Sequence, residues 1–241
     1  SRRRHTRYWR DWSSDVCSSD LTIPNSFFVT ATPSFAGAGN GTLLSTGTFF
    51  MSGGNKSLAV TSGTFGFAVL GSDSGTSRFT KTGTGTLVIT NAADANVGTS
   101  PSGYFNFNGG TLLIGNNTAL GSGTFFLNSN TNVVKGYNAD LTAIPNTVVL
   151  GTGSTQFAGD YSLTFTGTLI QNASRDIVNF LATGKTLTFN GPTLLQDPAN
   201  AGSRQLQVWG STTGTTIFGG NIDRKSTRLN SSHANISYAV F

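Results

Sequence analysis

A three-residue step of glycine, threonine and an apolar residue recurs along the middle of this chain and constrains its fold more than any other feature. Several of these steps lie 22 to 25 residues apart. A period of this size, with strand residues and turns but no helical pattern, is typical of the coils of a solenoid. The steps begin at Gly41, Gly47, Gly63, Gly85, Gly110, Gly123 and Gly167, with a looser copy at Gly191.

The best-preserved copy of the repeat runs from Lys81 to Gly123 and contains two short runs with strand character, Thr86–Thr90 and Thr111–Gly115. Each run follows a Gly-Thr step, and polar, glycine-rich sequence separates them. One such unit cannot bury its own apolar side chains, so it requires similar units stacked on it. We therefore predict an all-β fold, a right-handed parallel β-helix in which equivalent strands of successive coils pair in parallel.

Alternate residues of each strand point to one face, which predicts an apolar interior that continues from coil to coil. Glycine and asparagine at the corners accept positive φ angles, and threonine and asparagine on the outside are expected to form polar ladders. About 22 residues per coil give roughly nine coils for residues 22–222. The predicted interior positions are Leu87, Ile89, Leu112, Ile114, Phe125, Leu127, Phe165, Leu169, Leu187 and Phe189.

Two parts of the repeat region depart from this pattern. Residues 22–36 contain two prolines and predict an irregular strand, and residues 133–180 contain only degenerate copies of the repeat. An antiparallel sandwich with many Gly-Thr turns is the alternative fold, because short strands with regular turn signals also suit a sandwich or barrel. Antiparallel hairpins throughout the molecule would exclude the solenoid.

The two ends of the chain differ from its middle. All 31 glycines lie between Thr22 and Ile222, whereas both histidines, the cysteine and two of the three tryptophans lie outside. A DNA segment that encodes residues 223–241 has a reverse complement that encodes residues 3–20 in another frame. That segment resembles a short-read sequencing adaptor with its index. We interpret residues 1–21 and 223–241 as adaptor-derived, non-native segments, expect them to be disordered, and exclude them from the fold.

This interpretation removes hypotheses that the ends would otherwise support. Ser1–Arg10 would be a basic, aromatic arm for nucleic acid, Asn235 a glycosylation acceptor, and Cys17 a guide to the redox compartment. Residues 22–222 carry seven Lys or Arg and six Asp, a net charge of +1. Nothing basic remains to attract nucleic acid or anionic lipid. No run approaches the roughly 18 apolar residues of a membrane-spanning helix.

The composition of the repeat region also excludes several catalytic classes. Residues 22–222 contain no Glu, His or Cys, but they contain 17 Phe with abundant Thr, Asn and Ser. A Ser-His-Asp triad, a thiol nucleophile and a zinc site with imidazole or thiolate ligands are therefore excluded there. Gly37, Gly39 and Gly41 superficially resemble a phosphate loop, but no helix or Lys-Ser/Thr pair follows, which predicts a turn.

Aspartate spacing supports one catalytic or metal-binding hypothesis. Three aspartate pairs lie 20 or 21 residues apart, which is close to one coil and would stack them on one face. Stacked carboxylates would bind Ca²⁺ or act as the acid and base of a polysaccharide-cleaving β-helix. The alternative is that loop aspartates show such spacings by chance. The pairs are Asp73 with Asp94, Asp140 with Asp160, and Asp176 with Asp197.

Aromatic side chains support a hypothesis of glycan binding. Trp209, Tyr104, Tyr137 and Tyr161 could stack on sugars, although isolated aromatic residues in a β protein also serve as core or corner packing. An exposed flat row of such rings would favour the binding hypothesis.

The stretch from Lys81 to Gly123 resembles the autotransporter-associated β-strand repeat of bacterial surface proteins. In that family a K-x-G-x-G-x-L step leads to G-G-T-L and then to A-L-G-S-G. Here these segments are Lys81–Leu87, Gly109–Leu112 and Ala119–Gly123. One clear copy is present, and the connection at residues 92–108 lacks the usual Tyr-Thr-Gly-rich sequence.

The resemblance implies a secreted or surface-displayed β-helical segment of a longer bacterial chain, structural or adhesive and not an enzyme. Its expected location is the cell surface or the extracellular space. Its expected partners are host or environmental glycans or surface proteins, with no nucleic acid, and we expect no cofactor, metal or catalytic residues. A carbohydrate-active β-helix and a glycan-binding module are the two alternatives.

Overall fold

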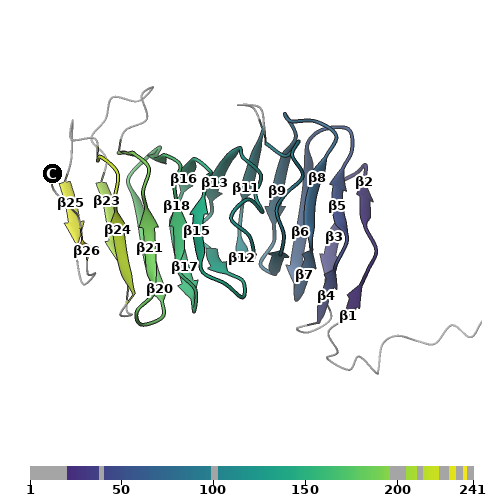
Figure 1. The fold of residues 1–241 in the computed structure, drawn as a ribbon, viewed down its shortest axis with the longest axis horizontal. Coiled ribbons are helices and arrows are strands. Elements are labelled where there is room, and N and C mark those ends of the chain that lie inside the picture. The colour runs from purple at the N-terminus through teal and green to yellow at the C-terminus, as the bar shows by residue number, and fades with distance from the viewer. Residues whose placement is uncertain are drawn as a thin grey trace, which may run out of the picture.

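The computed structural model describes residues 21–37, 41–98, 103–195, 205–210, 214–222, 228–231 and 236–237. These residues form β-strands and turns without a helix, and every strand pairing between them is parallel. The strands stack side by side along the long axis of the molecule (Figure 1). The predicted parallel β-solenoid is confirmed, and the antiparallel sandwich is excluded.

Each coil visits three sides in the same order, and the first side is a ten-stranded sheet. Its first nine strands bound about eight complete turns of the solenoid, one fewer than the roughly nine coils expected. The strands, in order, are β1 (Leu21–Ile23), β4 (Thr42–Ser45), β7 (Thr64–Phe67), β10 (Thr86–Ile89), β12 (Gly110–Ile114), β14 (Asn132–Gly136), β17 (Ser154–Gly159), β20 (Arg175–Leu181), β23 (Gln205–Trp209) and β25 (Arg228–Ser231).

The last side visited in each coil is an eight-stranded sheet. Its strands are β3 (Ser34–Ala36), β6 (Lys56–Ser62), β9 (Arg78–Thr82), β11 (Tyr104–Phe107), β13 (Thr124–Asn128), β16 (Val148–Thr152), β19 (Leu169–Gln171) and β22 (Thr193–Leu194).

The intermediate side consists of two separate sheets. Turns at residues 95–98 and 117–120 occupy the two coils between them, where Val97, Ala119 and Leu120 still face the core. The interruption therefore falls inside the best-preserved repeat. The first sheet contains β2 (Phe27–Val29), β5 (Thr48–Met51) and β8 (Val69–Ser72); the second contains β15 (Leu141–Ile144), β18 (Leu163–Phe165), β21 (Thr186–Phe189), β24 (Thr215–Phe218) and β26 (Ile236–Ser237).

The Gly-Thr steps set the register of the first side. Thr64 pairs with Thr42 on one neighbouring strand and with Thr86 on the other, and Thr86 pairs in turn with Thr111. Four steps of the repeat are therefore stacked directly on one another. The step at Gly123 belongs instead to the eight-stranded sheet, so the motif marks more than one corner of the coil.

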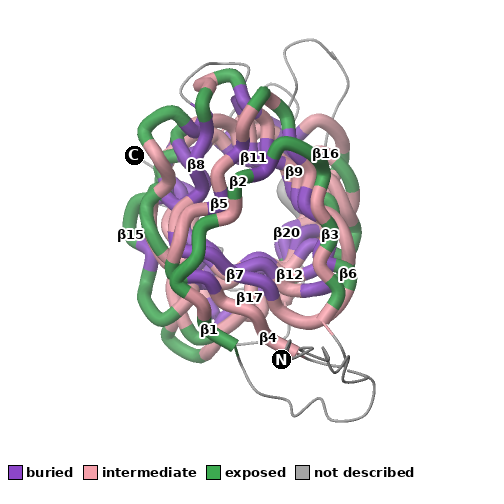
Figure 2. The backbone as a smooth tube through the Cα atoms, turned by 90° about the vertical axis from the view of Figure 1, so that its right-hand side faces the viewer, coloured by how far each residue is buried: buried purple, intermediate pink, exposed green. Residues whose placement is uncertain are grey.

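The interior is apolar and continuous along the stack. All ten positions predicted to be interior are at most 1% exposed. Phenylalanine rings from successive coils contact one another, for example Phe165, Phe189 and Phe218, whose adjacent ring centroids are 5.4 and 5.6 Å apart. Viewed from its end, the molecule shows buried residues lining the inside of the ring of sheets and exposed residues gathered at its outer corners (Figure 2).

Two segments that looked irregular in the sequence are regular in the structure. Residues 22–36 were expected to form one irregular strand, but with Leu21 they form β1, β2 and β3, one complete coil. Residues 133–180 form complete coils from β14 to β20 despite their degenerate sequence. Parallel pairing to well-formed neighbours determines these conformations, because tertiary context overrides weak local strand preference.

The expected disorder of the ends falls mostly on residues outside those described. At Leu21 and at residues 228–231 and 236–237 the outcome differs, because β1 pairs with β4, β25 pairs with β23 and β26 pairs with β24. The last coil of a solenoid presents unpaired backbone N–H and C=O groups, and such an edge accepts an extended segment with little regard to its sequence. Among the described residues there is no helix that could cross a membrane.

Candidate functional site

The strand register separates the aspartates that were predicted to stack. Asp176 pairs with Ser154 on one side and with Gln207 on the other, and its carboxylate accepts a hydrogen bond from Ser154 Oγ at 2.9 Å. The backbone N–H of Asp94 donates to the carbonyl of Leu70, so Asp94 is out of register with Asp73. Asp197 lies outside the described residues. Spacing close to one coil was therefore not sufficient, since corners of different length shift the register.

Asp73 has local partners of its own. Its carboxylate accepts hydrogen bonds from the Gly53 N–H at 2.8 Å and from Ser52 Oγ at 3.0 Å. The Gly53 N–H, followed by the Ser52 hydroxyl, lowers the pKa of this exposed carboxyl. Asp73 thus connects the loop after β8 to the loop after β5 in the preceding coil.

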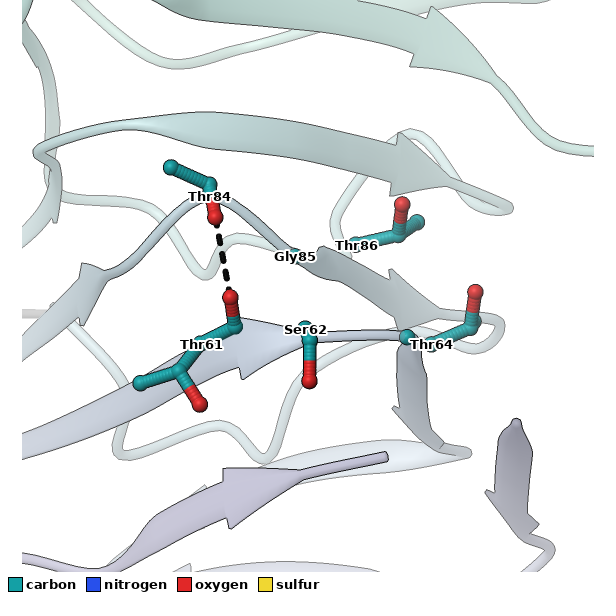
Figure 3. A pocket seen from close by; sticks show the side chains of 7 residues that line it. Thr61, Ser62, Thr64, Thr84, Gly85 and Thr86 are labelled. Carbon is teal, nitrogen blue, oxygen red and sulfur yellow. Dashed lines mark hydrogen bonds between the residues drawn. The ribbon is translucent and has the colours of Figure 1, made fainter. Parts of the chain in front are cut away.

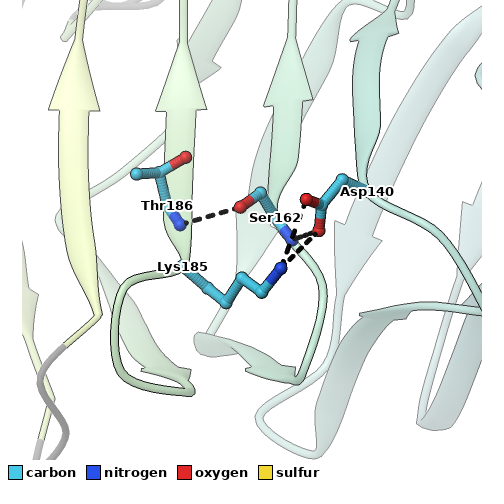
Figure 4. A network of polar contacts seen from close by, with 4 residues as sticks. All are labelled: Asp140, Ser162, Lys185 and Thr186. Carbon is cyan, nitrogen blue, oxygen red and sulfur yellow. Dashed lines mark hydrogen bonds and ion pairs between the residues drawn. The ribbon is translucent and has the colours of Figure 1, made fainter.

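Asp140 forms an ion pair with Lys185 on the outside of the solenoid (Figure 4). The carboxylate accepts a hydrogen bond from the Ser162 N–H at 2.7 Å, and the Lys185 ammonium lies 3.1 Å away. The Ser162 N–H, and after it Lys185, lowers the pKa of Asp140. Ser162 Oγ accepts a hydrogen bond from the Thr186 N–H at 3.1 Å, so the network links three successive coils. This arrangement links the coils, and the register places Asp140 opposite Ser162 and not opposite Asp160, its predicted partner.

A shallow hollow of about 350 Å³ lies on the outside of the corner between β6 and β7 and the equivalent corner of the next coil (Figure 3). Its lining includes Thr61 and Thr84, and Thr84 Oγ1 donates to the Thr61 carbonyl at 2.9 Å. Gly63 and Gly85 also line it, and each is packed closely against backbone atoms, Gly63 against the Gly41 carbonyl and Gly85 against the carbonyls of Val60 and Gly63. The hollow presents hydroxyl and backbone groups but no titratable side chain, so it can bind polar groups without performing acid-base chemistry.

Tyr104 lies on the outer face of the eight-stranded sheet, where neighbouring side chains already contact its ring. The Arg78 guanidinium lies 4.8 Å from the ring centroid. The Phe126 ring meets it edge-on with centroids 5.1 Å apart. Beside them Asn128 Nδ2 donates to Asn106 Oδ1 at 2.7 Å, which is one of the expected polar ladders.

The remaining aromatic candidates lie elsewhere and do not form one row with Tyr104. Trp209, 40% exposed, lies on the first side, where Phe180 meets it edge-on at 6.4 Å between centroids. Tyr137 and Tyr161 are partly buried in the turns after β14 and β17. The exposed flat row that would favour glycan binding is not formed by these four residues.

Sequence reasoning missed an exposed aromatic pair. Phe28 is 70% exposed and stacks on Phe50 with ring centroids 5.4 Å apart and planes 11° apart. Two consecutive phenylalanines in one strand must point to opposite faces, so Phe27-Phe28 and Phe49-Phe50 each place one ring outside. That doublet was the signal available in the sequence.

The first residue of the best-preserved repeat points into the core. Lys81 is 0% exposed and lies between Leu58 and Phe107 of the adjacent strands. Its ammonium donates hydrogen bonds to three backbone carbonyls, and its burial lowers its pKa to about 8. A lysine side chain is normally expected on the outside of a protein, so nothing in the sequence identified this position as internal.

The structure offers no evident metal site or phosphate loop in the part of the chain that it describes. No three His, Cys, Asp or Glu side chains come together there in a group that could hold a metal ion. Gly37 follows β3 and Gly41 precedes β4, while the predicted turn between them, Gly39 included, lies outside the described residues.

Comparisons of this chain with protein-family models, with curated proteins and with solved structures find no match. The candidate features must therefore be interpreted from their own geometry.

Proposed function

We propose that this chain is a non-catalytic structural segment of a secreted or surface-displayed bacterial protein. Its role there is to display its outer surface. The observation that carries the proposal is the orientation of the repeat motif. Its lysine and apolar residues face the interior, and its glycines form the corners. The most distinctive residues of the sequence thus support the stacking of coils.

The outer surface supports the same proposal. The outward residues on the first side include the stacked threonines, and the carboxylates of Asp73, Asp140 and Asp176 accept hydrogen bonds from neighbouring coils. The resemblance of Lys81–Gly123 to the autotransporter-associated repeat supports a location at the cell surface or outside the cell. Acid-base cleavage of a polysaccharide would require a pair of carboxylates close together, and the described aspartates are not stacked by the register.

Surface display of the full chain tests this proposal. The chain is fused between an epitope tag and an outer-membrane anchor in a bacterium, and antibody binding and protease resistance of the displayed segment are measured on intact cells. We expect the epitope to be accessible and the segment to resist proteolysis. A Gly110→Ala version serves as the matched control for a displayed segment with a damaged fold.

Two results would contradict the proposal. One is rapid proteolysis of the displayed wild-type segment at the same rate as the Gly110→Ala control. The other is hydrolysis or elimination of a polysaccharide by the purified chain, measured as the release of new reducing ends.

A further inference from the structure

The Lys81 side chain ends in a cluster of backbone oxygen atoms. Its Nζ atom lies 2.7 Å from the carbonyl oxygen of Gly83, 2.6 Å from that of Gly85 and 2.6 Å from that of Gly109. An ammonium has three N–H donors, so every one of them has an acceptor. The ring of Phe107 adds a further cation-stabilising contact, with its centroid 5.5 Å from Nζ.

This ammonium is compensated by dipoles and not by a carboxylate. In the described part of the chain, the ion pair forms at Lys185 and Asp140 on the outer surface. The strands that surround Lys81, namely β6, β9, β11 and β12, contain no acidic residue. A buried cation is costly unless hydrogen bonds satisfy it, and here the carbonyl oxygens supply that compensation.

Glycines shape the surroundings of the ammonium, and Gly110 leaves the room for it. Gly83 and Gly110 have φ angles of 81° and 78°, in the left-handed region that favours glycine. A Cβ atom on Gly110 would overlap the Lys81 ammonium, and it would also lie 2.5 Å from the Gly85 oxygen. In the Gly-Gly pair, Gly109 therefore supplies an acceptor carbonyl to the cluster and Gly110 leaves the space for the cation.

The three carbonyls come from two consecutive coils. Gly83 and Gly85 form the corner that follows β9, and Gly109 precedes β12 in the next coil. The Gly85 oxygen also accepts a hydrogen bond from the Thr111 N–H of that coil. A slip of one residue between the coils would turn alternate side chains to the opposite face, and it would move the Gly109 carbonyl away from Lys81.

We propose that the carbonyl oxygens of Gly83, Gly85 and Gly109, together with the ring of Phe107, form a built-in site for a primary ammonium. Lys81 is its resident occupant and thereby holds two consecutive coils in register. The ligand class is a primary alkylammonium, since the site supplies three acceptors around one nitrogen, and Leu58 and Phe107 on the adjacent strands provide apolar neighbours for the stem. The proposal goes beyond the surface role proposed above, and that role would survive its failure.

Chemical rescue of Lys81→Ala in the full chain tests the site. n-Propylammonium replaces the atoms that this variant lacks beyond Cβ, and 1-propanol serves as the uncharged control. Lys56→Ala is the matched control variant, because Lys56 is also buried on the inner face of the same sheet, at 8% exposure, but makes one hydrogen bond of 3.3 Å to the Gly53 carbonyl. The measurement is the urea midpoint of unfolding.

We expect Lys81→Ala to lower the urea midpoint by about 1 M or more, and Lys56→Ala to lower it by less than about half as much. n-Propylammonium should raise the midpoint of Lys81→Ala but not of Lys56→Ala, and 1-propanol should raise neither. If Lys81→Ala does not fold alone, its refolding yield with n-propylammonium should exceed that with 1-propanol. Equal midpoints for the two variants, or no selective rescue of stability or yield, would overturn the proposal.

Discussion

Two corners of the solenoid share a Gly-x-Gly sequence but are held by different donors. In Gly83-Thr84-Gly85 both glycine carbonyls accept hydrogen bonds from the Lys81 ammonium. In Gly121-Ser122-Gly123 both glycine carbonyls accept from the Asn146 side-chain amide, at 3.0 and 2.6 Å. The first glycine of each corner has positive φ, 81° and 72°. The same backbone corner is therefore compatible with a charged or a neutral buried donor.

The difference lies in how completely each donor is satisfied. Lys81 has three acceptors for its three N–H groups, and one of them lies in the next coil. Asn146 uses its amide nitrogen but leaves its buried Oδ1 without a partner. An unpaired buried polar atom costs free energy, so the neutral corner gains less from its donor. We expect the Lys81 corner to contribute more to stability, provided that its charge remains compensated, although both hydrogen bonds of Asn146 cross between coils and one of the three from Lys81 does so.

Adding a methyl group at Gly110 should break the Lys81 corner most severely. Gly110→Ala places a Cβ against the ammonium and two carbonyl oxygens at positive φ, and we expect a loss of about 4 kcal/mol in unfolding free energy, or failure to fold. Urea titration followed by circular dichroism measures it.

Gly184→Ala is the control for this substitution. Gly184 has a similar φ, 76°, but nothing lies within 4 Å of an added Cβ. The Gly184→Ala variant should lose only about 1 kcal/mol of unfolding free energy, which is the cost of placing a side chain at positive φ. If both alanine variants lost the same stability, crowding of the cation would not be the cause.

The buried charge of Lys81 should make the unfolding free energy depend on pH in the alkaline range. Burial lowers the pKa of Lys81 to about 8 from its usual 10.5, so between these values the unfolded chain binds more protons than the folded chain. Unfolding free energy should therefore rise with pH across this window, by at most about 3 kcal/mol. Below pH 8 Lys81 is protonated in both the folded and the unfolded chain, so the full free-energy cost of burying its charge remains.

The control for this dependence is Lys81→Met, which cannot titrate. Nearby titratable and charged groups are Tyr104, Arg78 and Lys56 on adjacent or shared strands, and subtracting the curve of the variant removes their contribution. A difference curve that falls between pH 8 and pH 10.5 would contradict the assigned state of Lys81.

The corner held by the neutral Asn146 side chain should contribute less to stability than the corner held by Lys81. Asn146→Ala leaves the carbonyls of Gly121 and Gly123 without this donor but also removes the unpaired Oδ1, so we expect a loss of about 2 kcal/mol. The loss for Lys81→Ala should be larger under the same conditions. The exposed Asn91, replaced by alanine, is the surface control, and thermal unfolding measures all three variants. A larger loss at Asn146 than at Lys81 would reverse the ranking of the corners.

The outer ion pair should matter least. Lys185→Met removes the partner of Asp140, but both side chains are partly exposed, at 33% and 45%. Such pairs contribute less than about 1 kcal/mol, and the Ser162 N–H continues to bind the carboxylate. Thermal unfolding at low and high salt should give nearly equal values for this variant and the wild type. A loss as large as that of Asn146→Ala would show that surface contacts, and not the buried corners, align the coils.

Much of the architecture was predictable because the Gly-Thr steps indicate both the length of a coil and which residues of successive coils pair. Thr64, Thr86 and Thr111 stack as their spacing indicated, and strand alternation then identified the apolar interior. Between residues 133 and 180 the repeat is weak, and the same reasoning identified only the step at Gly167 and the interior positions Phe165 and Leu169, while stacking on neighbours completes the coils.

The buried donors were not predictable, because spacing does not reveal where a polar side chain is compensated. Lys81 and Asn146 become internal only because backbone carbonyls surround them, and those carbonyls are positioned by glycines of other segments. The aspartate hypothesis failed to find support for a related reason. Separations near one coil do not account for corners that shift the register, as at Asp94 and Asp73.

Amine labelling of the folded full chain tests the central claim most directly. A water-soluble acylating reagent is applied at neutral pH, and the modification of each lysine is followed by mass spectrometry. Lys81 should remain unmodified while the partly exposed Lys135 and Lys185 react, and it should react after denaturation in urea. Modification of Lys81 in the folded chain at the rate of Lys185 would show that its ammonium is not enclosed by the corner carbonyls.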